Sequence, residues 1–136
     1  MDFDKITVQD AIRRSMLTEK NAMDFYRLGA LKMRDAEARR VFELLSGEER
    51  DHAESFYRIY TGEDVPSLEA FLAHPPYHES DWMAALDKLI EAGFNEQKSL
   101  ELAMQKELQL EERLSKMAEN ISDPAVRAVF EMNVKS

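Results

Sequence analysis

The sequence contains no cysteine, and this absence removes several kinds of chemistry at once. Disulfide bonds, thiolate nucleophiles, cysteine-ligated zinc and iron–sulfur clusters all need a residue that the chain does not have. Any bound metal must therefore be held by carboxylate and imidazole groups, the ligand set that suits iron and manganese among other ions.

Glycine and proline are also scarce, with four of each among 136 residues. Long stretches are instead rich in Ala, Leu, Glu, Lys, Arg and Met, so the composition predicts an all-α chain. The length is enough for one domain with a substantial core but not for two. We therefore expect a single helical domain over residues 1–136.

Excess basic charge and long apolar runs are missing as well. The formal net charge of −9 argues against nucleic-acid or anionic-membrane partners, because both bind basic patches. No apolar run approaches the ~20 residues of a membrane span. The N-terminus lacks the basic and apolar regions of a secretory leader. The sequence thus favours a cytoplasmic protein without nucleic-acid or membrane partners.

The most informative motif is a Glu-x-x-His pair, Glu49 and His52, inside an apolar helical stripe. The stripe advances in steps of three and four residues, which places its members on one helix face: Ala38, Val41, Leu45, Glu49, His52, Phe56 and Ile59. A core stripe would ordinarily carry Leu or Ile at these two positions, because burying a lone carboxylate is costly. An inward carboxylate and imidazole one turn apart can hold a metal ion in a helical bundle. The alternative is a solvated helix face, on which this spacing arises by chance.

Two other glutamates interrupt apolar stripes. Glu19 lies in a helix expected over residues 7–33, and Glu107 in a long helix expected over residues 81–119, with Gly93 as a kink. The inward positions of the first helix are Ile12, Ser15, Met16, Glu19, Ala22, Met23, Tyr26 and Ala30. Those of the long helix are Leu100, Ala103, Met104, Glu107, Leu110, Glu111, Leu114 and Met117. Each glutamate taken singly could also be a partly solvated side chain at the bundle edge.

Capping and breaking signals set the other elements. Asp35 can cap the second helix, which should end near residue 60. The proline-containing segment 63–80, with a short helix at 66–73, is longer than a bundle turn and predicts a crossover along the bundle. Asp123 and Pro124 are a helix start signal for a short last helix.

An internal repeat relates the two halves of the chain. Sliding the sequence on itself by 88 residues places Glu19 on Glu107 and the Val-Phe-Glu run at 41–43 on the same run at 129–131. The repeat predicts two related helical hairpins joined by the crossover. Projected forward by the same offset, a second Glu-x-x-His would begin one residue beyond Ser136.

This arrangement of glutamates, Glu-x-x-His and crossover resembles the rubrerythrin branch of the ferritin-like di-iron proteins. The resemblance covers about residues 8–60 and 82–136. Supporting local patterns are Ala22-x-x-Phe25-Tyr26, Val41-Phe42 and the run from Asp123 to Phe130. The resemblance implies a ferritin-like four-helix bundle with a long crossover between the second and third helices and a short fourth helix.

By position, the resemblance implies that Glu19, Glu49, His52 and Glu107 are iron ligands, with Glu49 a bridging carboxylate. A complete site of this family holds two iron ions, and manganese or zinc are alternative metals. No catalytic residue is expected beyond the metal ligands. Leu110 stands where rubrerythrins place an additional glutamate that takes part in peroxide chemistry, which lowers the peroxidase efficiency that we expect.

The function implied by the resemblance is that of a di-metal carboxylate oxidoreductase acting on hydrogen peroxide or dioxygen. Because the chain has no Cys-x-x-Cys pairs for a rubredoxin-like domain, an external electron donor is expected. The alternative is not an enzyme but a helical interaction or assembly module with a partial or single-metal site. Iron storage is a third possibility and would need a closed shell of many subunits.

Other residues attract simpler interpretations. His74 and His78 lie beside prolines in a loop and are expected to be solvated, and Tyr26 is expected to fill the core. Trp82 should anchor the crossover.

The short last helix predicts a homodimer, because a neighbouring chain would cover apolar side chains that so short a helix leaves exposed.

Overall fold

The computed structural model describes residues 3–135, with side chains from 8 to 134. Within this range the chain forms helices and no strands. The helices are α1 (Phe3–Lys32), α2 (Ala36–Ile59), α3 (Leu68–Ala73), α4 (Asp81–Glu91), α5 (Glu96–Glu119) and α6 (Pro124–Lys135). None of the described helices is both long enough and apolar enough to cross a membrane. The all-α prediction is confirmed.

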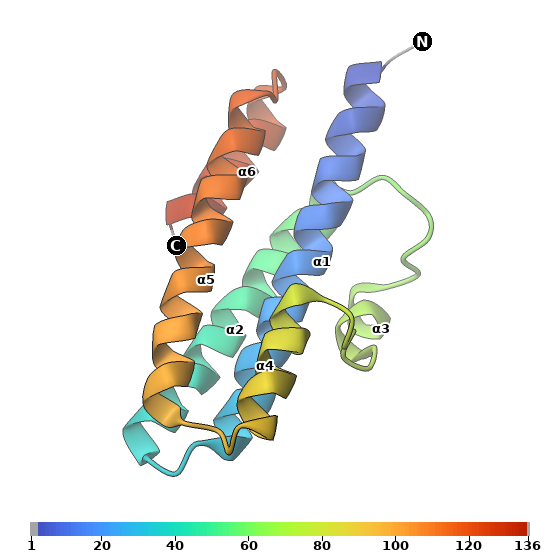
Figure 1. Cartoon of the computed structure of the whole chain (residues 1–136). Helices are drawn as coiled ribbons and strands as arrows, with labels where there is room; N and C mark the ends of the chain where they lie inside the picture. Colours follow the sequence, from blue (N-terminus) through green and yellow to red (C-terminus); the bar gives the residue numbers. More distant parts are fainter. Residues whose placement is uncertain (1–2, 136) are drawn as a thin grey trace.

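Four of these helices form a bundle of two antiparallel hairpins, α1–α2 and α5–α6. Figure 1 shows that α5 runs in the same direction as α2, so the intervening chain must return along the length of the bundle. This is the ferritin-like arrangement, with a long crossover between the second and third bundle helices. The fourth bundle helix, α6, has 12 residues against 30 in α1, which confirms the expectation of a short last helix.

The expectation of one long helix over residues 81–119 is wrong. The chain breaks between α4 and α5, where Gly93 has φ +92° and Phe94 has φ +48°. Glycine adopts this left-handed conformation without a steric penalty and commonly follows the last residue of a helix. Asn95 then starts a new helix, because its side chain accepts a hydrogen bond from the N–H of Lys98 at 2.9 Å. The crossover therefore includes α4 as well as α3.

Two helix starts agree with the capping signals. The side chain of Asp35 accepts from the N–H of Ala38 at 2.8 Å, and α2 follows it. The side chain of Asp123 accepts from the N–H groups of Ala125 at 2.9 Å and Val126 at 3.3 Å, at the start of α6. Both aspartates satisfy N–H groups that have no partner inside the helix.

An aromatic cluster fills the core where α1, α2 and α4 meet. The ring of Tyr26 lies 5.1 Å from that of Phe42 at an angle of 89°, and the ring of Phe25 lies 5.1 Å from that of Trp82. Gly29 lets α1 approach Phe42 closely, since a Cβ there would meet the ring at 2.8 Å. Trp82 thus fixes α4 against α1, which agrees with its expected role as an anchor of the crossover.

The inward stripes are only partly as expected. All eight inward positions of α1 are buried. On α5, however, Met104 is 69% exposed although its repeat counterpart Met16 is fully buried, and on α2 Val41 is 41% exposed. Met16 lines a pocket beside α1 together with Phe71 of α3. The prediction that Met104 points inward is wrong.

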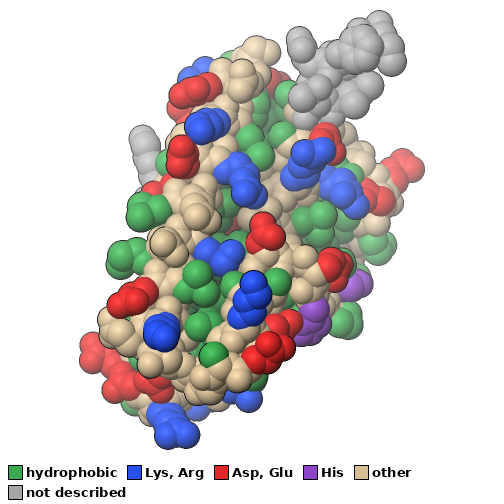
Figure 2. Space-filling view, in the orientation of Figure 1, with side chains coloured by type: hydrophobic (Ala, Val, Ile, Leu, Met, Phe, Trp, Pro, Cys, Tyr) green, Lys and Arg blue, Asp and Glu red, His purple; other side chains and the backbone are tan. Residues whose placement is uncertain are grey.

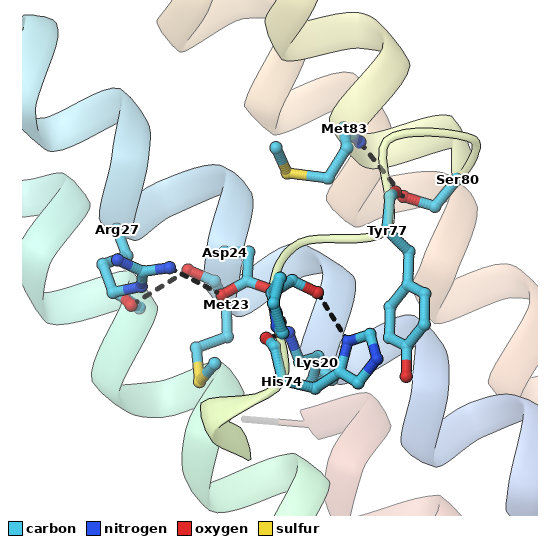
Figure 3. A network of polar contacts seen from close by, with 10 residues as sticks. Lys20, Met23, Asp24, Arg27, His74, Tyr77, Ser80 and Met83 are labelled. Atoms are coloured by element: carbon cyan, nitrogen blue, oxygen red, sulfur yellow. Dashed lines mark hydrogen bonds and ion pairs between the residues drawn. The ribbon is translucent and has the colours of Figure 1, made fainter. Parts of the chain in front are cut away.

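A buried lysine fastens the crossover to α1 (Figure 3). The Nζ of Lys20 donates to the carboxylate of Asp24 and, at 2.7 Å, to the carbonyl oxygen of His74, and it lies 5.4 Å from the centre of the Tyr77 ring. Asp24 also accepts from Arg27 at 3.2 Å. The side chains of Lys20 and Asp24 are 0% and 1% exposed, so this ion pair belongs to the interior.

Polar contacts also hold the two hairpins together. Glu96, in the first turn of α5, accepts hydrogen bonds from the backbone N–H groups of Arg34 and Asp35 in the turn between α1 and α2. Further along, Asn133 of α6 donates to Ser55 of α2 at 3.0 Å. The first contact attaches the start of α5 to the end of the α1–α2 hairpin.

Candidate metal centre

Three of the predicted site residues converge between α1 and α2. Glu19 comes from α1, and Glu49 and His52 come from successive turns of α2. Each offers a ligand atom, and these atoms all lie within 4.8 Å of one another. The Nδ1 of His52 lies 3.4 Å from Oε2 of Glu19 and 3.6 Å from Oε2 of Glu49. A single cation could therefore contact all three side chains after small rotations.

The cluster is buried and short of hydrogen-bond donors. Glu19 is 0% exposed and Glu49 is 2% exposed. Within the described part of the chain, both carboxylate oxygens of Glu19 and Oε2 of Glu49 are buried without a hydrogen bond. Buried carboxylates normally have donors or a cation, because leaving them unpaired is costly. The donor set present, two carboxylates and an imidazole, fits a divalent ion such as iron, manganese or zinc.

Glu107 approaches the same space from α5. Its Oε1 accepts a hydrogen bond of 2.8 Å from the hydroxyl of Tyr26, and its carboxyl is near enough to Glu49 for the charge of Glu49 to raise the pKa of Glu107. It does not belong to the group of atoms within 4.8 Å. The structure thus brings Glu19, Glu49 and His52 together and places Glu107 at the margin of their cluster.

The pKa values in the cluster depart from their ordinary range because several acidic groups share a buried space. Burial, and then the nearby carboxyl of Glu19, raise the pKa of Glu49 to about 8, while His52 opposes the change. Burial and the charge of Glu49 raise the pKa of Glu107 to about 7, and the Tyr26 hydrogen bond opposes it. Burial alone lowers the pKa of His52, but Glu19 and Glu49 outweigh it and raise the pKa to about 10. At neutral pH the metal-free cluster therefore holds protons that a cation would displace.

Tyr26 lies near the candidate site, a position that the sequence left open as an alternative to core filling. It was expected to fill the core, and it does so with its ring, but its hydroxyl also reaches Glu107. The signal was its spacing, since Tyr26 follows Glu19 by seven residues and so lies two turns along the same stripe. Nothing in the spacing shows which side chain its hydroxyl meets on another helix.

The two loop histidines lie away from the cluster. His74 is exposed, its Nδ1 contacts the carbonyl oxygen of Pro75 at 2.7 Å, and its ring stacks on that of Tyr77 at 4.3 Å. His78 is exposed and pairs with Asp87 at 2.8 Å. Neither joins a group of three potential ligands among the described residues. Their exposure agrees with the expectation that both are solvated.

Fold and cluster together define a class: a ferritin-like helical bundle with a carboxylate–histidine group between its helices that could hold a metal ion. The family model described as Rubrerythrin matches residues 10–135. The chain therefore belongs to the rubrerythrin family, and the resemblance drawn from the sequence is confirmed. Comparisons with curated proteins and with solved structures give no significant match.

Proposed function

We propose that this chain is a rubrerythrin-type iron protein, an oxidoreductase that acts on hydrogen peroxide or dioxygen and receives electrons from an external donor. One observation carries the proposal: both carboxylate oxygens of Glu19 and Oε2 of Glu49 are buried without a hydrogen-bond partner in the described part of the chain, and Oε2 of each lies within 3.6 Å of the imidazole of His52. A divalent cation would satisfy all three groups at once. Family membership supports iron as that cation.

In this proposal Glu19, Glu49 and His52 hold the metal, and Glu107 is the ligand supplied by α5. Bound iron would supply the electrons that reduce the oxidant, and the external donor would restore them. The side chains of the protein bind the metal and orient one another. Glu49 and His52 give up protons when the cation enters, and the Tyr26 hydroxyl, whose pKa is raised by burial and by Glu107, stays protonated and fixes one oxygen of Glu107.

The first test is metal content. Protein purified from iron-supplemented cells is expected to carry iron, and the variants Glu19→Gln and His52→Ala to carry much less. Glu48→Gln is the matched control, because Glu48 is exposed on the same helix. Consumption of hydrogen peroxide and of dioxygen, each with a chemical reductant, then identifies the oxidant. Equal metal content in all four proteins would exclude this centre as the metal site.

A second candidate function is an interaction or assembly module with a partial or single-metal site. It is favoured by exposed apolar side chains beside the bundle, namely Met104 at 69%, Leu108 at 62% and Leu44 at 63% exposure. The two candidates differ in redox chemistry. A protein that binds metal but consumes neither oxidant, at any reductant concentration, supports the module.

The same exposed side chains support a homodimer in which a second copy covers them. Met104 and Leu108 lie one turn apart on α5 and share a helix face. Light scattering at high protein concentration is expected to give the dimer mass, and Met104→Lys with Leu108→Lys to give the monomer mass. The matched control is Gln105→Lys, which adds a charge at an exposed position of the same helix. A monomeric wild-type protein contradicts the dimer.

A further inference from the structure

A small polar pocket lies where α1, α5 and the first turn of α4 meet, apart from the candidate metal centre. Its volume is about 90 Å³, enough for several water molecules or one small ion. Thr18 and Asn21 of α1, Trp82 of α4, and Lys106 and Arg113 of α5 are among its lining residues. On the face drawn in Figure 2, basic side chains lie where α5 approaches α1 and the start of α4.

Two cations of this pocket form no close ion pair in the part of the chain that the structure describes. Lys106 is half-buried with its Nζ 5.2 Å from the centre of the Trp82 ring, and Arg113 lies two turns further along α5. Within the described residues, neither makes an ion pair, whereas Lys116 on the same helix pairs with Glu112 at 3.2 Å.

The start of α4 adds further positive character. The first backbone N–H groups of a helix have no partner inside the helix, and the helix dipole favours an anion at that end. Ser80 caps the N–H of Met83 at 3.3 Å, and Asp81 and Trp82, the first two residues of α4, line the pocket. The carboxylate of Asp81 also lines the pocket and opposes an anion.

The electrostatics of Lys106 agree with a partly desolvated cation in need of a partner. Burial lowers the pKa of Lys106, and Arg113 lowers it further, while Asp81 opposes both. An anion that contacts both basic groups would raise the pKa of Lys106 again, because its negative charge stabilises the protonated ammonium.

We propose that this pocket binds a small tetrahedral oxyanion of phosphate type, either free or as the terminal group of a small phosphomonoester. An ammonium and a guanidinium from α5 line the pocket, and the N-terminal end of α4 borders it. An oxyanion with several acceptor oxygens can contact both cations and is favoured by the dipole of that helix end. The small volume restricts the part that enters to the oxyanion itself. The site is independent of the proposed iron chemistry.

Trp82 is the only tryptophan, so its fluorescence reports on the pocket directly. The full chain is titrated with inorganic phosphate in the presence of a chelator, which keeps phosphate away from bound metal, and at constant ionic strength set with chloride. A saturable fluorescence change with a Kd of about 1 mM or below is expected. A parallel titration with glycerol 3-phosphate identifies the source, because tighter binding of the ester points to a phosphomonoester as the ligand.

Four variants are expected to change the affinity for phosphate in different directions. Lys106→Met and Arg113→Gln each weaken binding about tenfold, because each removes a charge-assisted hydrogen bond. Asp81→Asn strengthens binding about threefold, because it removes the opposing charge. Lys116→Met lowers the net charge equally but lies outside the pocket, and it leaves binding unchanged. Circular dichroism of each variant confirms that helix content is preserved.

The site does not exist if neither phosphate nor the ester gives a saturable change up to about 10 mM, or if chloride alone gives the same change. It is also overturned if Lys116→Met weakens binding as much as Lys106→Met, since binding would then follow net charge rather than the pocket. The Asp81→Asn variant keeps the test decisive even where Lys106→Met fails to fold.

Discussion

The hydroxyl of Tyr26 donates a hydrogen bond of 2.8 Å to Oε1 of Glu107, and this bond joins α1 to α5 beside the carboxylate–histidine cluster. Tyr26→Phe removes the bond and keeps the ring. We expect a loss of about 0.5–1.5 kcal/mol in the free energy of unfolding, together with a rise in the pKa of Glu107, because the lost bond favoured its ionised form. Urea unfolding and carboxyl NMR titration measure the two effects. Tyr57→Phe is the control, since the Tyr57 hydroxyl makes no hydrogen bond within the described residues. Equal changes in the stability and in the pKa of Glu107 in this control would contradict their origin in the Tyr26–Glu107 bond.

Replacing Glu49 by leucine should stabilise the metal-free protein. Glu49 is 2% exposed and its Oε2 has no hydrogen-bond partner in the described structure, so an apolar side chain removes an unfavourable burial. The expected gain is about 1–3 kcal/mol in chelator, with loss of metal binding. Urea unfolding with and without ferrous iron measures both. Glu48→Leu, at an exposed neighbour, should change stability by less than about 0.5 kcal/mol. A destabilised metal-free Glu49→Leu protein would mean that Glu49 is an ordinary structural residue.

Loss of the imidazole should separate metal binding from folding. His52→Ala removes a ligand from α2 and is expected to leave the helical circular-dichroism spectrum unchanged, because the side chain is partly exposed and alanine favours the helix. Ferrous iron should raise the melting temperature of the wild type but not of this variant. If iron stabilises both proteins equally, His52 is not a ligand.

The metal-free protein should become less stable as the pH rises. The folded pKa values of Glu49, about 8, and of His52, about 10, both lie above the ordinary values of 4.5 and 6.5 for these side chains. The folded state therefore binds more protons than the unfolded state across this window, and stability falls as those protons leave. In chelator, the melting temperature at about pH 9 should be lower than at about pH 6. Glu49→Gln should flatten the dependence, and an unchanged slope in that variant would contradict its origin in the cluster.

Metal affinity should show the opposite dependence. Glu49 and His52 must lose protons before they can bind a cation, so the affinity for ferrous iron should rise between about pH 6 and about pH 8, with release of protons. Calorimetry in two buffers of different ionisation enthalpy measures the number of protons released. A pH-independent affinity would show that neither residue contacts the metal.

Much of the fold could be predicted because the helix stripes and caps are local signals. Asp35, Asp123 and the buried positions of α1 follow from spacing and from side chains that satisfy helix ends. The break at Gly93 was also encoded locally, by a glycine that can end a helix and by Asn95, which can start one. A kink was expected there instead, because apolar spacing continues on both sides of the break and does not show that the chain reverses direction.

The candidate site was predictable to the extent that its residues interrupt stripes on their own helices. Glu19, Glu49 and His52 could be placed in the interior, but the sequence could not show that Glu107 would lie at the margin. That position depends on how far α5 stands from the first hairpin. Lys20 and Asp24 show the same limit, since their i,i+4 spacing is typical of a surface ion pair, and only the path of the crossover buries them.

The attachment of Glu96 to the turn between α1 and α2 has a mechanical consequence for the centre. One hairpin, α1–α2, carries Glu19, Glu49 and His52. Glu107 lies on the other hairpin, roughly three turns of helix beyond Glu96. A small change in the angle of α5 about Glu96 would move Glu107 and leave Glu19, Glu49 and His52 in place. The candidate centre thus takes Glu19, Glu49 and His52 from one hairpin, and the distance of Glu107 from them depends on the angle between the hairpins and on its hydrogen bond with Tyr26.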